Sequence, residues 1–295
     1  MPPTITCPHE LPQKLFGYDV VQYLGEGAAS HIYAVSDPAT AQLYALKHVV
    51  RKTEKDERFL EQLEAEFKVG SAVNHPNLRK CLDLKSNRSL LLKINEAALI
   101  MELFDGQPMD QLPDRPIHRK VAEFFQVAKG LEALHAAGYV HCDLKPNNIL
   151  IAEQDRPEGR PHLKVIDLGQ GCPVGTTKER IQGTPDYIAP EQVKCDPLTH
   201  RTDVFNFGAT MYWAFTGQKL PTLFNVKKSG GNSFLLESAL KSPQDLNPLV
   251  PNTLSNFIME CVRMDPMQRP PNMKEITTRL EVIHYACTRA ARAAS

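Results

Sequence analysis

The sequence predicts an α+β fold with a small strand-rich part followed by a larger, mainly helical part. In roughly the first hundred residues, short apolar runs with strand-like alternation surround a single helical stretch. After DGQPMDQLPDRP, apolar residues recur at helical spacing, and helical segments alternate with proline-rich loops. We therefore expect two lobes that are joined near residues 102–107.

The strand-rich part is predicted from alternation and from glycine and proline breaks. We expect strands at YDVVQYLGEG (18–27), HIYAVSD (31–37), QLYALKHVV (42–50), LRKCLDL (78–84) and AALIMELF (97–104). One helix is expected over residues 54–73, because apolar residues recur there at helical spacing, at Phe59, Leu60, Leu63 and Phe67. The segment HPNL, which follows directly, is expected to end this helix.

The helical part begins with the amphipathic stretch VAEFFQVAKGLEALHAAG (121–138), for which Gly138 supplies a C-cap. The apolar stretch LKVIDLG (163–169) predicts a strand that ends in an aspartate at a glycine turn. From Asp203 onward helices dominate, and the last one is expected from Met273 to about Ala291.

Composition narrows the classes of protein that fit the chain. Lys and Arg number 34, and so do Asp and Glu, a balance that argues against nucleic-acid or anionic-membrane binding by bulk charge. No run reaches the ~18 apolar residues of a membrane span. The N-terminal MPPTITCPHELPQKLF lacks the apolar core of a secretory signal, so we expect a cytoplasmic protein. The 7 cysteines show no Cys-x-x-Cys spacing, which favours reduced thiols.

The glycine-rich stretch LGEGAASHI (24–32) lies between two expected strands. Glycines let backbone amides approach a polyphosphate without a Cβ in the way. A simple hairpin turn explains the same residues equally well. Because no helix follows, the dinucleotide-binding interpretation of a glycine loop is disfavoured.

Lys47 ends the apolar run YAL of an expected strand. A lysine that points inward needs a carboxylate partner, because an unpaired buried charge is costly. Glu66 on the following helix is the best candidate, and Glu64 is the alternative. Alternatively, Lys47 is a solvent-exposed charge at the edge of the strand, in which case it needs no carboxylate partner.

Two polar segments of the helical part could carry chemistry. HCDLKPNN (141–148) places Asp143, Lys145 and Asn148 within one loop, and Asp167 ends LKVID. Carboxylate and amide oxygens are suitable Mg²⁺ ligands. Taken alone, the first segment is a solvated surface turn and Asp167 the end of a strand in an Asx-turn.

Taken together and in order, these segments resemble the protein kinase superfamily from about Tyr18 to about Tyr285. The series is LGEGAASHI, YALK, the helix with Glu66, HCDLKPNN, IDLG, GTPDYIAPE (183–191), DVFNFG (203–208) and DPMQRP (265–270). Two family patterns are altered, because H-R-D becomes His141-Cys142-Asp143 and D-F-G becomes Asp167-Leu168-Gly169. The residues of these motifs resemble those of bacterial kinases of the eukaryotic type more than those of animal regulatory kinases.

The resemblance implies a bilobal protein kinase fold and a set of site residues. The chain would then consist of an N-terminal extension (1–17), an N-lobe that contains helix C (18–102), a hinge (103–107) and a C-lobe (108–295). Catalytic roles would fall to Asp143, Lys145, Lys47, Glu66 and Thr184. Metal ligands would be Asn148 and Asp167, and a structural ion pair would join Glu191 to Arg269, two residues that could otherwise be surface charges.

The resemblance also implies ATP as the phosphoryl donor, with Mg²⁺, which Mn²⁺ could replace. ATP-binding residues would be Leu24, Gly25, Glu26, Gly27, Ala28, Ala29, Ser30, His31, Ile32, Ala45, Lys47, Met101, Glu102, Leu103, Phe104 and Leu150. Lys145 and Gly183-Thr184-Pro185 are similar to serine/threonine kinases, so the expected partners are proteins that offer Ser or Thr hydroxyls, and not nucleic acids. Oligomeric state stays undetermined.

Two other functions share this fold. A pseudokinase would normally have lost one of Lys47, Asp143, Asn148 or Asp167, and none is missing. Small-molecule phosphotransferases of the fold generally lack a GTPDYIAPE-like segment and the Arg269 partner. The chain is expected to be either a minimal kinase or the catalytic domain of a longer receptor.

Cys142 stands where many kinases carry the arginine that binds a phosphorylated activation-segment residue. We therefore expect activity without activation-segment phosphorylation, although Thr176 and Thr177 are available acceptors near Lys178 and Arg180. For Cys142 itself, a buried structural role is favoured over a redox switch, because nothing in the sequence depresses its pKa.

Overall fold

The computed structural model describes residues 10–27, 29–88, 94–155, 162–228, 230 and 240–294. The chain divides into two compact units. The first unit comprises the residues up to Asn74 together with Arg79–Asp105, and the second comprises His75–Leu78 and Gly106–Ser295. Among the described residues, no helix is both long enough and apolar enough to cross a membrane.

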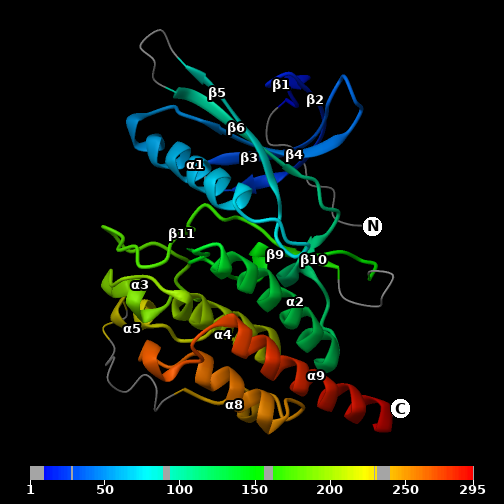
Figure 1. The fold of residues 1–295 in the computed structure, drawn as a ribbon, viewed down its shortest axis with the longest axis vertical. Coiled ribbons are helices and arrows are strands. Elements are labelled where there is room, and N and C mark those ends of the chain that lie inside the picture. The colour runs from blue at the N-terminus through cyan, green and yellow to red at the C-terminus, as the bar shows by residue number, and fades with distance from the viewer. Residues whose placement is uncertain are drawn as a thin grey trace. The chain divides into compact units, whose positions relative to one another are not determined.

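The first unit is built on a 6-stranded antiparallel sheet with the order β1-β2-β3-β4-β6-β5. Its strands are β1 (Lys14–Leu15), β2 (Tyr18–Gly27), β3 (Ser30–Ser36), β4 (Leu43–Val50), β5 (Cys81–Arg88) and β6 (Ile94–Glu102). A 3-10 turn (Glu54–Asp56) leads into helix α1 (Glu57–Ser71), which lies against one face of the sheet (Figure 1). The five predicted strands and the predicted helix are present, and β1 was not predicted.

Alternation along β4 separates the two faces of this sheet. Ala45 and Val49 join a buried cluster with Leu60 and Leu63 of α1, whereas Leu46 belongs to an aromatic cluster on the opposite face. Because successive side chains of a strand point to opposite faces, Lys47 lies on the same face as Ala45 and Val49. The sheet therefore directs this lysine toward helix α1.

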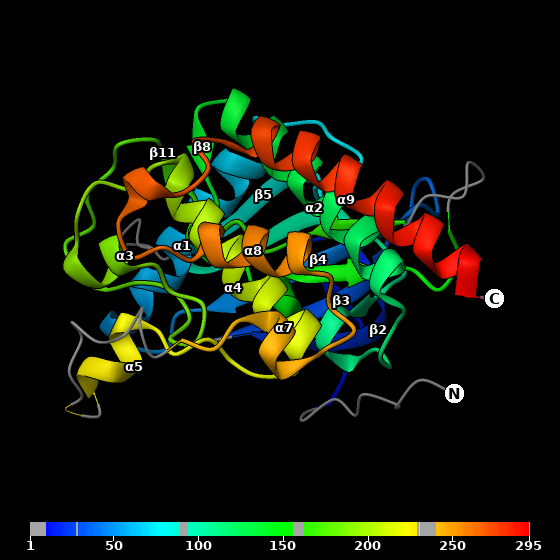
Figure 2. The ribbon, with the colours of Figure 1, turned by 90° about the horizontal axis from the view of Figure 1, so that it is seen from below.

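The second unit is mainly helical (Figure 2). Its main helices are α2 (Ile117–Ala136), α3 (Pro190–Lys194), α4 (His200–Thr216), α5 (Leu223–Lys228), α7 (Pro243–Leu246), α8 (Asn252–Cys261) and α9 (Met273–Ala294). Short strands form two small sheets, β7 (Gln107–Pro108), β9 (Ile149–Ile151) and β10 (Leu163–Val165) in one, and β8 (Tyr139–Val140) and β11 (Cys172–Pro173) in the other. The 3-10 turns are Met109–Gln111, Pro146–Asn148 and Pro266–Gln268. Helix α9 runs along α2, and α8 packs on α4.

Helix α4 forms the centre of the second unit. Thr199 caps its N-terminus, where its hydroxyl accepts a hydrogen bond from the backbone of Arg201 at 3.3 Å. Gly217, at φ 71°, ends it. At Gly208, a Cβ would come within 2.5 Å of the Cβ of Cys261 on α8, so only glycine allows this close approach.

Several boundaries differ from the sequence predictions, among them those of α1, which spans Glu57–Ser71, and of β6, which spans Ile94–Glu102. Helix α2 begins at Ile117 and ends at Ala136, with Gly138 in the left-handed conformation at φ 84° just beyond it. Strand β10 ends at Val165, so Asp167 lies beyond the strand and not at its end. The predicted strand at 78–84 begins at Cys81, because the backbone of Asn77 pairs with Val165 at 2.8 Å and holds residues 75–78 in the second unit.

Candidate active site

The first unit joins Lys47 to Glu66. Lys47 Nζ lies 2.6 Å from Glu66 Oε2, and the Glu66 side chain is 2% exposed. Glu66 is on the buried face of α1, three residues after Leu63, whereas Glu64 is exposed. The Cys81 thiol donates to the Glu66 carbonyl oxygen at 3.6 Å, and burial, followed by the Glu66 carboxylate, raises the pKa of Cys81 to about 12. The pairing selects Glu66 over Glu64.

The predicted nucleotide-binding residues of the first unit lie on β2, β3 and β4, in the turn between β2 and β3, and at or just after the end of β6. Gly25 takes φ 145° beside a register shift in the β2–β3 pairing, and Ala29 takes φ 68° before Ser30. Ala45 faces Met101 in register, and both are buried. The positions on these strands and just after β6 are Leu24, Glu26, Gly27, His31, Ile32, Glu102, Leu103 and Phe104. Ala28 lies outside the described residues.

In the second unit, Asp143 is the centre of a hydrogen-bonded group. Thr184 donates to Asp143 Oδ1 twice, from its hydroxyl at 2.7 Å and from its backbone N–H at 2.9 Å. Lys145 Nζ donates to Asp143 Oδ2 at 2.8 Å and to the Thr184 hydroxyl at 2.9 Å. The predicted residues Asp143, Lys145 and Thr184 are thus brought together, although Thr184 is 39 residues from Lys145 in the chain.

Asn148 is fixed by the same loop. Its side-chain Nδ2 donates to the backbone carbonyl oxygen of Asp143 at 2.9 Å. The backbone carbonyl oxygen of Asn148 accepts a hydrogen bond from the Ile166 N–H, also at 2.9 Å. Asp167 follows Ile166 with a left-handed backbone at φ 62°. The neighbouring Leu150, predicted to contact a nucleotide, lies on β9 opposite Lys164.

Asp203, which sequence reasoning placed only in a motif, supports the loop from α4. Its carboxylate accepts hydrogen bonds from the backbone N–H groups of His141 and Cys142, both at 2.8 Å, and from His135 Nε2 at 2.8 Å. Complete burial opposes ionisation, but the hydrogen bonds and the nearby His135 lower the pKa of Asp203 below its usual value. A charged Asp203 therefore holds the two residues that precede Asp143.

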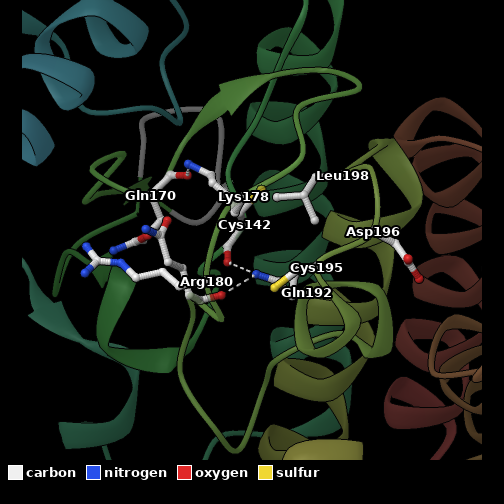
Figure 3. Close-up of a pocket in the computed structure, with 9 residues that line it drawn as sticks. Cys142, Gln170, Lys178, Arg180, Gln192, Cys195, Asp196 and Leu198 are labelled. Atoms are coloured by element: carbon white, nitrogen blue, oxygen red, sulfur yellow. Dashed lines mark hydrogen bonds between the residues drawn. The ribbon is translucent and has the colours of Figure 1, made fainter.

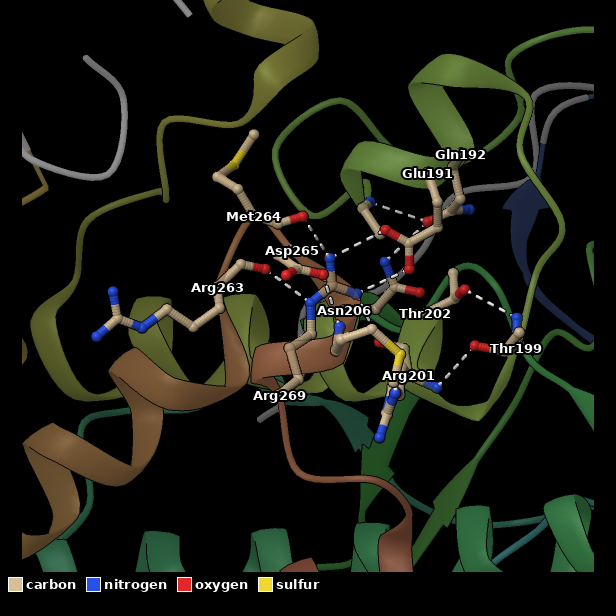
Figure 4. A network of polar contacts seen from close by, with 12 residues as sticks. Glu191, Gln192, Thr199, Arg201, Thr202, Asn206, Arg263, Met264, Asp265 and Arg269 are labelled. Atoms are coloured by element: carbon tan, nitrogen blue, oxygen red, sulfur yellow. Dashed lines mark hydrogen bonds and ion pairs between the residues drawn. The ribbon is translucent and has the colours of Figure 1, made fainter. Parts of the chain in front are cut away.

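Glu191 and Arg269 form a buried two-pronged ion pair (Figure 4). Arg269 Nη1 lies 2.7 Å from Glu191 Oε1, and Nη2 lies 3.0 Å from Oε2. The same guanidinium donates to three backbone carbonyl oxygens, those of Arg201, Arg263 and Met264. Every Arg269 nitrogen is therefore used, which is the condition under which a buried arginine is tolerated.

A pocket opens beside Cys142 (Figure 3). Its walls come from the loop of residues 141–148, from the segment after Asp167, from α3 and from the turn that follows α3, and its lining includes Gln170, Lys178, Arg180, Gln192 and Cys195. Gln192 was not predicted from the sequence. Its amide donates to the carbonyl of Cys142, a link that no local sequence pattern signals.

Comparison with known families agrees with this arrangement. The model of the protein kinase domain matches residues 18–279, most of the chain. The chain therefore belongs to the protein kinase family.

The individual relatives described next are 26–29% identical to the chain. A probable serine/threonine-protein kinase of Clostridium perfringens is 26% identical over 280 residues, which are 92% of this chain and 39% of that protein. The serine/threonine-protein kinase pkn3 of Myxococcus xanthus is 26% identical over 91% of this chain and 50% of its own length. Death-associated protein kinase 2 of Mus musculus is 29% identical over 72% of this chain and 57% of its own. The chain thus spans less than two thirds of each of these relatives.

Proposed function

We propose that this chain is a serine/threonine protein kinase that transfers the γ-phosphoryl group of ATP to Ser or Thr hydroxyls of proteins. The observation that carries the proposal is the group formed by Asp143, Lys145 and Thr184. A carboxylate within reach of a lysine ammonium and a threonine hydroxyl can accept a proton while the ammonium offsets charge on a transferred group. The names of the relatives favour the same activity.

In this proposal Asp143 orients the substrate hydroxyl and takes its proton as the hydroxyl oxygen bonds to the γ-phosphorus. The bond between the γ-phosphorus and the bridging oxygen breaks, and ADP leaves. Lys145 offsets the charge that develops on the transferred phosphoryl oxygens. Thr184 keeps the Asp143 carboxylate in one orientation through its two hydrogen bonds.

The donor set of the second unit fits Mg²⁺. Since Asn148 Nδ2 is used on the Asp143 carbonyl, the side chain can offer its oxygen, Oδ1, to a cation. Asp167 would supply a carboxylate, and oxygen ligands are those that Mg²⁺ prefers. When bound, Mg²⁺ neutralises phosphate charge, a role that Mn²⁺ could also fill.

For the first unit, we assign nucleotide binding to the predicted positions on and around β2, β3, β4 and β6. Lys47, held by Glu66 at 2.6 Å, would contact the α- and β-phosphates. Residues 18–102 would then be the N-lobe, except for His75–Leu78, which belong to the second unit, with 103–107 as the hinge and 108–295 as the C-lobe.

We also propose that activity does not require a phosphorylated activation segment. This segment is already held by direct contacts, since Gly175 N–H donates to Leu198 O at 2.7 Å and Leu198 N–H donates to Thr176 O at 2.9 Å. Cys142 packs in an apolar cluster with Val140 and Leu198, and it carries no charge to offer a phosphate. Lys178 and Arg180 line the adjoining pocket, so a phosphate could still modulate the rate.

Phosphotransfer from radiolabelled Mg-ATP to a generic protein substrate tests the proposed activity. We expect label on the substrate and, after acid hydrolysis, in phosphoserine or phosphothreonine. Nucleotide binding without any transfer would instead indicate a pseudokinase. Label on an aminoglycoside or on choline, with none on protein, would indicate a small-molecule phosphotransferase.

A further inference from the structure

Two thiols, those of Cys142 and Cys172, meet next to the catalytic loop. Strands β8 and β11 pair antiparallel and place Cys172 opposite Val140, two residues before Cys142. Both cysteines belong to one buried cluster with Val140 and Leu198, and they are 2% and 5% exposed. One thiol therefore comes from the catalytic loop and the other from the segment that follows Asp167.

The environment polarises this pair. The hydrogen bond shared with Cys172, and then burial, raise the pKa of Cys142 well above its usual value. The same hydrogen bond, from Cys142, lowers the pKa of Cys172 to about 7; burial opposes this, and the Lys178 ammonium and the Thr176 hydroxyl add to it. The pKa of Cys142 therefore lies above that of Cys172. Asp203 raises the pKa of both thiols and does not alter this order.

We propose that Cys142 and Cys172 form a reversible disulfide when the protein meets a peroxide-class oxidant. The two cysteines lie on backbone-paired segments and pack in one buried cluster, so their side chains are neighbours that can approach to the sulfur–sulfur bond length of about 2.05 Å. Cys142 lines the pocket of Figure 3, so in this proposal a small oxidant approaches the pair from the pocket side.

The reaction balances with hydrogen peroxide alone. The Cys172 thiolate attacks one peroxide oxygen, the O–O bond breaks, and Cys172 becomes a sulfenic acid as hydroxide leaves and takes a proton. The Cys142 sulfur then attacks the Cys172 sulfur, and the sulfenic oxygen leaves as water with the Cys142 proton. In total two thiols and one peroxide give one disulfide and two water molecules.

Such a bond would act on Asp143 through the backbone. The Cys142 N–H donates to Asp203 at 2.8 Å, and its carbonyl accepts from Gln192 at 2.7 Å. A disulfide would displace the side chain of Cys142 and with it the backbone of this residue, which directly precedes Asp143. This regulatory consequence rests on the proposed kinase activity, whereas disulfide formation does not.

The test uses the whole purified chain, reduced first and then treated with hydrogen peroxide at neutral pH. Free thiols are blocked with iodoacetamide in denaturant, and tryptic peptides are examined by mass spectrometry. Trypsin does not cleave before proline, so Cys142 falls in peptide 130–164 and Cys172 in peptide 165–178, each with a single cysteine. We expect these two peptides to be linked, with the loss of two hydrogens, and released by dithiothreitol.

Matched variants make the result specific. The link should persist in Cys195→Ser, which removes another thiol of the same pocket, and should be missing from Cys142→Ser and Cys172→Ser. Free Cys142 and Cys172 after treatment, or Cys172 oxidised to sulfinic acid without a link, would overturn the proposal. If the chain phosphorylates protein, its rate should fall in proportion to the linked fraction and recover with dithiothreitol. An unchanged rate in fully linked protein would overturn the regulatory consequence, while the peptide map is decisive even for an inactive chain.

Discussion

The side-chain amide of Gln192 donates to the carbonyl oxygen of Cys142 at 2.7 Å and so connects helix α3 to the loop that contains Asp143. The same Nε2 donates to Gln182 O at 3.1 Å, and Oε1 accepts from Ala189 N–H at 2.9 Å and from Asn206 Nδ2 at 3.0 Å. Gln192 is 4% exposed. One buried amide therefore joins four parts of the second unit.

Replacing this amide should affect both stability and turnover. Gln192→Met keeps the length of the side chain and leaves buried groups without partners, at about 1–3 kcal/mol each. We expect a lower kcat with little change in the KM for ATP, together with a lower free energy of unfolding by urea. Gln42→Met, at an exposed position, is the control. A destabilised Gln192→Met enzyme with normal kcat would show that the amide is structural only.

The lysine–glutamate pair of the first unit offers a direct comparison on one helix. Glu66→Gln removes the charge that holds Lys47, and hydrogen bonds to charged groups contribute about 1.5–3 kcal/mol. We expect kcat/KM for ATP to fall about tenfold to a hundredfold, measured at a fixed protein substrate concentration. Glu64→Gln, on the exposed side of α1, should leave it unchanged. Equal effects of the two substitutions would contradict the assignment of Glu66.

Two arginine–glutamate pairs of the second unit have the same chemistry but differ in burial, so they can show how burial changes the contribution of an ion pair to stability. Arg269 pairs with Glu191 and lies over the ring of Phe205, and its side chain is 0% exposed. Arg279 pairs with Glu260 and also lies over a phenylalanine ring, but its side chain is 32% exposed.

Arg269→Ala should therefore lower the unfolding free energy by roughly 3–5 kcal/mol, because it leaves a buried carboxylate unpaired. Arg279→Ala should cost at most about 1 kcal/mol for its exposed ion pair, plus the loss of packing on the ring. Urea unfolding of the two variants measures the difference. Similar losses would mean that burial does not set the contribution of the Arg269 pair.

The expectation about the activation segment is tested at its threonines. The Thr176 hydroxyl donates a hydrogen bond to the backbone carbonyl oxygen of Pro173 at 2.6 Å, and Thr177 is exposed. The Thr176→Ala/Thr177→Ala double variant, like phosphatase-treated enzyme, should keep most of its initial rate. A lag in the wild-type reaction that follows phosphate incorporation at either threonine would show that Cys142 has not removed the phosphate response.

The local features of the fold could be predicted from the sequence, because they follow from short periodicities. Alternation located β2, β3 and β4, and helical spacing located α1 with Glu66 on the same face as Leu63. Contacts between distant segments could not be predicted in this way. Residues 75–78 belong to the second unit because Asn77 pairs with a strand 86 residues later, where its side chain donates to Leu163 O.

The candidate site shows the same division. Asp143, Lys145 and Thr184 were found through their motifs, but the contact between Cys142 and Cys172 depends on β8 and β11, which are two residues long and have no periodicity. The sequence therefore raised the question whether Cys142 is reactive, whereas the lower pKa belongs to Cys172, which no pattern in the sequence singles out. Gln192 is likewise defined only by partners that the fold brings to it.

In the proposed reaction Asp143 accepts the proton of the substrate hydroxyl, and one pair of assays on Asp143→Asn tests this role most directly. General-base catalysis contributes roughly 10²–10⁴-fold, so the initial rate of phosphoryl transfer to protein should fall by that factor. Binding of a fluorescent ATP analogue with Mg²⁺ should stay close to that of the wild type, whereas Asp167→Asn should weaken it. Near-normal transfer by purified Asp143→Asn protein would contradict the account.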